Sequence, residues 1–224
     1  MGKQSLSYLS MQVISIIDLS LLINPTQLAI PIDAEQQHFQ LAMKQTCMKL
    51  PTEPLLIAHP QIDRWIVEVG LLFPQVFEWE PPKLLVDRQL GAKLCIGNQD
   101  AFVQINTNVA FLGNRNANLI EWAIRHPSLN WPDKVKLWVT AECLSLPPEK
   151  LKLTILALHP THPGKRHEIS WDSHQHKETR NWLVSVMTKQ ATPTKTPIAS
   201  LVKSPSLVKT GADFDIDNIE EIEI

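Results

Sequence analysis

The sequence predicts an α+β domain: a mixed, mainly antiparallel sheet with a few packing helices, plus a disordered C-terminal tail. Short alternating apolar runs separated by turn-forming residues indicate the strands. Apolar residues at helical spacing indicate the helices. Apolar residues make up 44% and charged residues 20% of the 224 positions, which is typical of a folded domain of medium size.

The first quarter of the chain predicts one strand and one helix. Residues 12–22 are rich in Ile, Val and Leu and stop at Asn24-Pro25, which favours a strand, with a short helix as the alternative. Asp33 is placed to cap a helix from Ala34 to about Lys49, in which apolar residues recur at helical spacing.

Prolines punctuate the next part of the sequence. Pro51, Pro54 and Pro60 are expected to break regular structure before a short helix over residues 62–73. The segment Glu78-Trp79-Glu80-Pro81-Pro82 ends that helix region, because paired prolines continue neither a helix nor a central strand.

The middle of the chain predicts three short strands and a helix. The strands are expected at residues 83–87, 92–96 and 101–105, with a turn at Gly97-Asn98. Residues 118–126 are expected to be helical, since Leu119, Trp122 and Ala123 share one side of a helix.

Strict alternation predicts the last strands. Val135 to Ala141 and Leu151 to Ala157 alternate apolar and other residues, and residues 167–171 are expected to return as a third strand. A closing helix is predicted over residues 174–187, with Asp172 or Ser173 as its cap.

Three parts follow from these patterns. Residues 1–188 form the globular domain, with a possible subdivision near residues 81–82. Residues 189–212 form a flexible linker, because 14 of its 24 residues are Thr, Pro, Lys or Ser and it contains no acid. Residues 213–224 form an acidic and apolar terminal peptide.

Charge and cysteine usage exclude some classes of function. The part from Lys189 onward holds four of the 21 basic and six of the 23 acidic residues, which leaves 17 of each in the domain. Because the domain is neutral by count, we do not expect it to bind nucleic acid directly. Cys47, Cys95 and Cys143 are far apart and odd in number, which favours a reducing compartment. No segment predicts a membrane span or a secretion signal, so a cytoplasmic protein is expected.

The terminal peptide carries the clearest functional pattern. Written as a strand, it places Phe214, Ile216, Ile222 and Ile224 on one face. Most of its acids fall on the other face, with Ile219 as the apolar exception. Such a peptide can add to an exposed sheet edge of another protein, and its acids would steer it to a basic groove. The expected partner-binding residues are Asp213, Phe214, Asp215, Ile216, Asp217, Ile219, Ile222 and Ile224. Contact with its own lysine-bearing linker, or a role in solubility alone, are the alternatives.

This arrangement of domain, linker and acidic tip is similar in outline to bacterial single-stranded-DNA-binding proteins, whose tip recruits repair enzymes. The resemblance covers only the last dozen residues. That family's tip ends in Pro-Phe, whereas this chain ends in Glu223-Ile224. The function of that family is therefore not carried over to this chain.

Histidines gather in one region, where five of the eight lie between residues 159 and 176. Neutral imidazoles bind zinc, so His159, His162, His174 and His176 are candidate metal ligands. Pro160 and Pro163 place the first pair in a turn, and no Cys or carboxylate completes a zinc pattern. A polar hairpin surface is therefore the favoured interpretation.

Acid and lysine groupings are the last chemical signal. A restriction-type nuclease needs an Asp and a Glu-x-Lys on neighbouring strands to hold Mg²⁺ and polarise water. Asp133, Glu142 and Lys152 lie in the strand-rich region, but Glu142 is followed by Cys143 and Leu144. No phosphate-binding loop, dinucleotide fingerprint or nucleophile elbow is present, and no catalytic residue or cofactor is assigned.

The sequence therefore favours a non-enzymatic interaction or assembly protein that docks through its C-terminal peptide on a protein of unknown identity. A metal-binding or hydrolytic enzyme that uses the 159–176 region is one alternative. A nucleic-acid-processing accessory subunit is the other.

Overall fold

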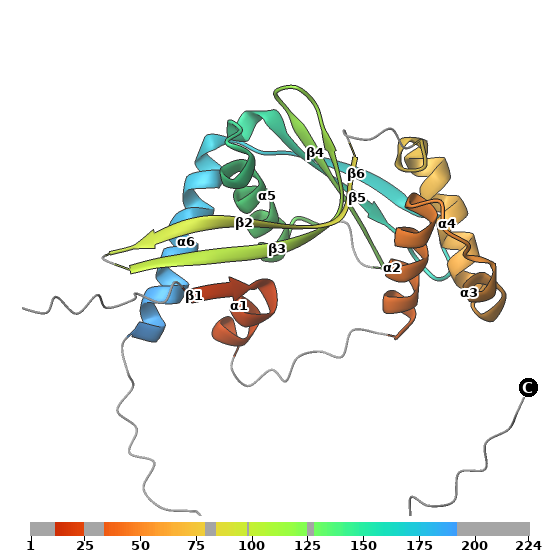
Figure 1. The fold of residues 1–224 in the computed structure, drawn as a ribbon, viewed down its shortest axis with the longest axis horizontal. Coiled ribbons are helices and arrows are strands. Elements are labelled where there is room, and N and C mark those ends of the chain that lie inside the picture. The colour runs from red at the N-terminus through yellow and green to blue at the C-terminus, as the bar shows by residue number, and fades with distance from the viewer. Residues whose placement is uncertain (1–11, 25–33, 79–83, 98, 125–127, 192–224) are drawn as a thin grey trace, which may run out of the picture. The chain divides into compact units, whose positions relative to one another are not determined.

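The computed structural model describes residues 12–24, 34–78, 84–97, 99–124 and 128–191 (Figure 1). All of these residues belong to one compact unit, Met1–Thr192. The terminal peptide, nearly all of the linker and the expected subdivision at residues 81–82 lie outside the described residues. Within the described residues, no helix is long and apolar enough to cross a membrane.

The described part contains six α-helices and six strands. The helices are α1 (Ile16–Ile23), α2 (Ala34–Cys47), α3 (Glu53–Ala58), α4 (Pro60–Leu72), α5 (Trp131–Leu144) and α6 (Ser173–Ala191). The strands are β1 (Gln12–Ser15), β2 (Leu84–Ile96), β3 (Gln99–Leu112), β4 (Ala117–Ala123), β5 (Leu151–Ala157) and β6 (Lys165–Ser170). Two 3₁₀ turns, η1 (Pro74–Val76) and η2 (Pro148–Lys150), complete the described part.

The strands form one mixed sheet in the order β1-β3-β4-β5-β6, and β2 pairs with β3. The pairs β2–β3, β3–β4 and β5–β6 are antiparallel, whereas β1–β3 and β4–β5 are parallel. The β4–β5 pair is parallel because α5 provides the crossover between them. The predicted α+β class with a mainly antiparallel sheet is therefore confirmed.

Helices pack against the sheet in two groups (Figure 1). One core cluster joins α2 and α4 to β4, β5 and the adjoining ends of β2 and β3. A second cluster joins α1, α5 and α6 to β1 and the far halves of β2 and β3. A third cluster lies between α5 and the strands β4 and β5.

The three short strands expected in the middle of the chain are replaced by a single long hairpin. The three short strands expected over residues 83–105 are two strands of 13 and 14 residues, joined at Gly97 in the left-handed conformation (φ 58°). Arg88 and Gln89, which lie between the first two expected strands, are paired with Thr107 and Asn106. Polarity alone did not end the strand, because its outer face is exposed to solvent.

Residues 118–126 were expected to be helical, and this prediction is wrong, because β4 occupies Ala117–Ala123. Both faces of β4 are covered by helices, so nearly all of its residues are buried. A strand buried on both faces gives a continuous apolar run, which cannot be distinguished from a buried helix by periodicity.

The strand expected over residues 135–141 is also wrong, because these residues lie in α5. Trp138 and Thr140, which were assigned to the polar side of the alternation, are as buried as Val139. The overlooked signal is the start of the helix. Asn130 and Asp133 form a reciprocal capping box, in which each side chain accepts the other residue's backbone N–H.

The other expected elements are present, with small changes in extent. α2, α4 and β5 match their predicted ranges closely, β6 is present, and α6 begins after Asp172 and continues to Ala191. Residues 12–22 contain both alternatives, a four-residue strand followed by a helix that Ser15 caps. Asp33, the expected cap of α2, lies outside the described residues. Pro60 separates α3 from α4, as expected, whereas Pro54 does not break structure, because it stands in the first turn of α3, where proline is tolerated.

We expect the cap of α5 to contribute measurably to stability. Asn130→Ala should lower the free energy of unfolding by about 1 kcal/mol, because it removes the acceptor for the Asp133 N–H. Asn130→Ser, which keeps a capping oxygen, should remain close to the wild type. Urea denaturation measures both variants, and equal destabilisation by Ala and Ser would show that the cap contributes nothing.

The three cysteines should differ in reactivity. Burial raises the pKa of the Cys47 thiol to about 12, whereas Cys95 and Cys143 are exposed. Since the thiolate is the reactive form, a thiol reagent at pH 8 should modify two cysteines rapidly and Cys47 only after unfolding. Mass spectrometry of the peptides identifies the modified residues. Rapid labelling of Cys47 in the folded protein would contradict this burial.

Candidate functional site at the bend of the sheet

The β2–β3 hairpin bends sharply near its middle. On β3, Ile105 packs in the cluster with α5 and α6, whereas Val109 packs in the cluster with α2 and α4. Residues separated by an even number lie on one face of a regular strand, so this switch shows that the strand turns over between them. The paired strand carries Asp87 at this point, in the left-handed conformation (φ 47°).

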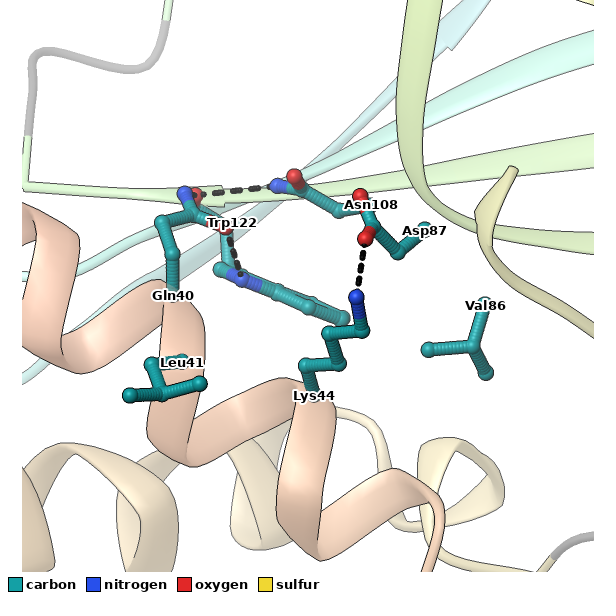
Figure 2. A pocket seen from close by; sticks show the side chains of 7 residues that line it. All are labelled: Gln40, Leu41, Lys44, Val86, Asp87, Asn108 and Trp122. Atoms are coloured by element: carbon teal, nitrogen blue, oxygen red, sulfur yellow. Dashed lines mark hydrogen bonds and ion pairs between the residues drawn. The ribbon is translucent and has the colours of Figure 1, made fainter. Parts of the chain in front are cut away.

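Polar side chains from four elements meet at this bend (Figure 2). Asp87 lies on β2, Asn108 on β3 and Trp122 on β4, while Gln40 and Lys44 come from α2. A cavity of about 130 Å³ lies among them.

Gln40 and Trp122 hold α2 against β4. The Trp122 indole N–H donates to Gln40 Oε1 at 2.9 Å, and Gln40 Nε2 donates to the Trp122 carbonyl oxygen at 3.3 Å. Asn108 Nδ2 donates to the same carbonyl at 3.3 Å. These bonds fix the orientation of both amide side chains at the wall of the cavity.

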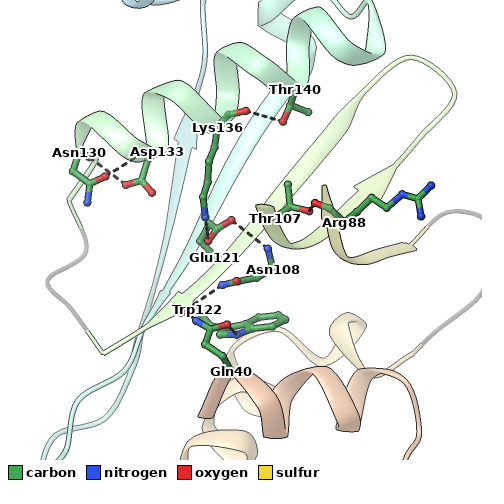
Figure 3. A network of polar contacts seen from close by, with 10 residues as sticks. All are labelled: Gln40, Arg88, Thr107, Asn108, Glu121, Trp122, Asn130, Asp133, Lys136 and Thr140. Atoms are coloured by element: carbon green, nitrogen blue, oxygen red, sulfur yellow. Dashed lines mark hydrogen bonds and ion pairs between the residues drawn. The ribbon is translucent and has the colours of Figure 1, made fainter. Parts of the chain in front are cut away.

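Glu121 projects from the opposite face of β4 toward α5 (Figure 3). It is only 5% exposed. Its Oε2 atom lies 2.6 Å from Lys136 Nζ, and its Oε1 atom lies 3.5 Å from the Asn108 backbone N–H. Both carboxylate oxygens therefore have partners within the protein, and the buried charge is neutralised by one lysine.

This acid–lysine pair was not found from the sequence. Glu121 is a single acid within the apolar run Leu119-Ile120-Glu121-Trp122, and a lone buried acid of this kind was the available signal. Lys136 could not be associated with it, because the sequence analysis placed residues 135–141 in a strand rather than in α5.

The acid–lysine set considered from the sequence is not brought together. Asp133 caps α5, Glu142 pairs with His176 at 2.8 Å, and Lys152 lies exposed on β5. Glu121 on β4 does not complete the motif either, because Ala123 stands two residues after it.

The four candidate histidines divide into separate groups. The Nδ1 atoms of His159 and His162 lie 3.0 Å apart, in the turn after β5. His174 is exposed near Glu178, and His176 contacts Trp171 and Glu142. Within the described part of the chain, no group of three or more His, Cys, Asp or Glu side chains is placed to hold a metal ion.

His159 has a structural role in this turn. Its Nδ1 atom accepts the backbone N–H groups of Thr161 and His162 at 3.1 and 3.2 Å. Its carbonyl oxygen accepts hydrogen bonds from Arg64 and Trp65 of α4. The turn is thereby fastened to α4.

The expected partner-binding residues of the terminal peptide, 213–224, lie outside the described residues.

Comparison with known proteins gives similarities of fold at low sequence identity. No family and no curated protein matches the chain. The crystal structure of SSO0001 is 13% identical over 81% of this chain and 78% of its own, with a TM-score of 0.40. A protein named "Putative exonuclease" from Eubacterium rectale is 10% identical over 71% of this chain and 67% of its own, with a TM-score of 0.48. Neither similarity contributes to the functional argument.

Proposed function

We propose that this is a non-enzymatic interaction protein, whose acidic C-terminal peptide docks on a partner protein. The observation that carries the proposal is the pattern of residues 213–224, which has six acids, no base and four apolar side chains that alternate onto one face of an extended strand. Such a peptide binds by adding a strand to a sheet edge, with its apolar side chains in alternate pockets.

The end of the folded part supports this arrangement. α6 ends at Ala191, and 21 residues rich in Thr, Pro, Lys and Ser separate it from Asp213. A chain of this length and composition would span roughly 25 Å root-mean-square, which lets the peptide reach a partner while the domain is bound elsewhere. Three unpaired cysteines support a reducing, cytoplasmic location.

The domain offers a surface for a second component. β1 is an end strand among the described strands, and Val13, Ile17 and Leu21 around it are 55%, 62% and 42% exposed. A cavity of about 240 Å³ lies beside these residues. Exposed apolar side chains near an unpaired strand edge are typical of a contact surface for another protein.

The chemistry at the bend also supports a non-enzymatic role. Glu121 is held by Lys136 and by a backbone N–H, so neither of its oxygens is directed at an open space. The half-exposed carboxylate on the other side of the sheet, Asp87, is likewise paired with Lys44.

Affinity capture tests the proposal. Full-length protein, residues 1–212, and a variant with Ser at Phe214, Ile216, Ile222 and Ile224 are used as bait in lysate of the source cells. Leu207→Ser, in the linker, is the matched control. We expect one protein to be captured by the full chain and the control and to be lost with the other two baits. An identical set from all four baits would contradict the proposal.

A further inference from the structure

The cavity at the bend has the composition of a small-ligand site. Leu41 and Val86 provide apolar walls, and the Trp122 indole lies beside them (Figure 2). Gln40 and Asn108 provide polar groups that are held in place by their bonds to Trp122. Small-molecule sites typically combine mostly apolar walls with a few fixed polar groups.

A charged pair stands at the mouth of the cavity. Lys44 Nζ lies 2.5 Å from Asp87 Oδ2, and the two side chains are 45% and 47% exposed. An ammonium donor and a carboxylate acceptor are therefore presented side by side, where a ligand can reach both. Within the described residues, Asn108 Oδ1 accepts no hydrogen bond and adds an acceptor at the wall.

The backbone of Asp87 gives independent support for a ligand site. Its φ of 47° is unfavourable for residues other than glycine, although aspartate tolerates it better than most. Residues in such conformations cluster at ligand-binding sites, where the surrounding structure holds them. Here the conformation coincides with the bend of β2 and directs the carboxylate to Lys44.

The volume of the cavity matches one ring. A cavity of about 150 Å³ in a protein core is known to hold benzene. At about 130 Å³, this cavity fits a single six-membered ring with its substituents in the open mouth. A fused bicyclic ring such as a purine would leave its second ring outside the cavity.

We propose that this cavity binds a pyrimidine base. Asp87 would accept a hydrogen bond from an N–H group on the edge of the ring, and Lys44 would donate a hydrogen bond to the adjacent acceptor atom of the ligand. Cytosine presents N4–H beside N3, and uracil presents N3–H beside O4, so both have the complementary edge. An aspartate acceptor for the cytosine amine is a known pairing. The ring plane would lie against Trp122 and the apolar walls. This proposal concerns the domain and does not rest on the C-terminal peptide.

Two sources can supply the same ring: a free nucleoside, or an unpaired base in a single strand. Isothermal titration of the full chain with cytidine, uridine, adenosine and guanosine tests the shared chemistry. We expect tighter binding of the two pyrimidine nucleosides than of the two purine nucleosides, whose second ring would remain outside the cavity. A dC₁₂ oligonucleotide and its abasic counterpart then distinguish the sources. If dC₁₂ binds more tightly than both cytidine and the abasic strand, the ligand is an unpaired base in a single strand. If cytidine binds at least as tightly as dC₁₂, the ligand is the free nucleoside.

Matched variants locate the binding. Asp87→Asn keeps a residue that tolerates the backbone conformation and removes the charge, and Lys44→Met removes the donor. Each should weaken binding about tenfold or more, since each removes a hydrogen bond to a charged group. Asp100→Asn is the control, because Asp100 forms a similar exposed pair with Lys93 and lies away from the cavity.

Three results would overturn the proposal: no pyrimidine binding at millimolar concentration, equal binding of purines, or equal weakening by Asp100→Asn and Asp87→Asn. Urea denaturation of each variant shows whether it remains folded. If one of the two cavity variants does not fold, the other is sufficient for the test. Failure here leaves the capture experiment with the terminal peptide unaffected, because the two use different residues.

Discussion

Lys136→Met is expected to lower the free energy of unfolding by about 3–5 kcal/mol. The substitution removes the cationic partner, Lys136, of the Glu121 carboxylate, which is 5% exposed. A buried charge that loses its partner carries its full desolvation cost, whereas an apolar replacement of the whole pair does not. Urea denaturation, monitored by tryptophan fluorescence, measures the change.

Two controls separate the loss of the pair from a loss of packing. Glu121→Gln combined with Lys136→Met removes both charges and should recover most of the stability. Lys44→Met removes one partner of a half-exposed pair and should change stability by at most about 1 kcal/mol. If Lys136→Met is no more destabilising than Lys44→Met, the buried pair is not the source of stability that its geometry indicates.

Trp122→Ala is also expected to cost about 3–5 kcal/mol. The side chain is 2% exposed, belongs to the core cluster that joins α2 and α4 to the sheet, and donates a hydrogen bond to Gln40. Its loss leaves a large cavity and an unpaired Gln40 oxygen. Trp122→Phe, which keeps most of the buried ring, should cost clearly less. Similar denaturation midpoints for Ala and Phe would show that packing at Trp122 contributes little.

The parts of the fold that could be predicted are those with exposed faces or clear ends. β5 and α6 follow their patterns, α6 with Asp172 at its start. β4 and α5 could not be predicted by periodicity, because each is buried on nearly all sides. In α5, Thr140 is buried, and its hydroxyl donates to the Lys136 carbonyl, so a residue expected on a polar face lies in the core.

The site at the bend depends on these two elements, and for that reason the sequence did not reveal it. Lys136 reaches Glu121 only because α5 crosses the face of β4. Asp87 and Lys44 are 43 residues apart and meet only because the hairpin turns over at Asp87. In the histidine region, proximity in the sequence also did not predict proximity in the structure. His159 contacts His162, whereas His174 lies beside Glu178.

The most direct test of the central claim is whether the terminal peptide is sufficient for partner binding. Residues 189–224 are fused to an inert carrier protein, and capture from lysate is compared with capture by the full chain. We expect the fusion to bind the protein lost from the 1–212 bait, and the fusion carrying Leu207→Ser to bind it as well. A fusion that captures nothing, while the full chain captures that protein, would contradict the claim that residues 213–224 are the ligand.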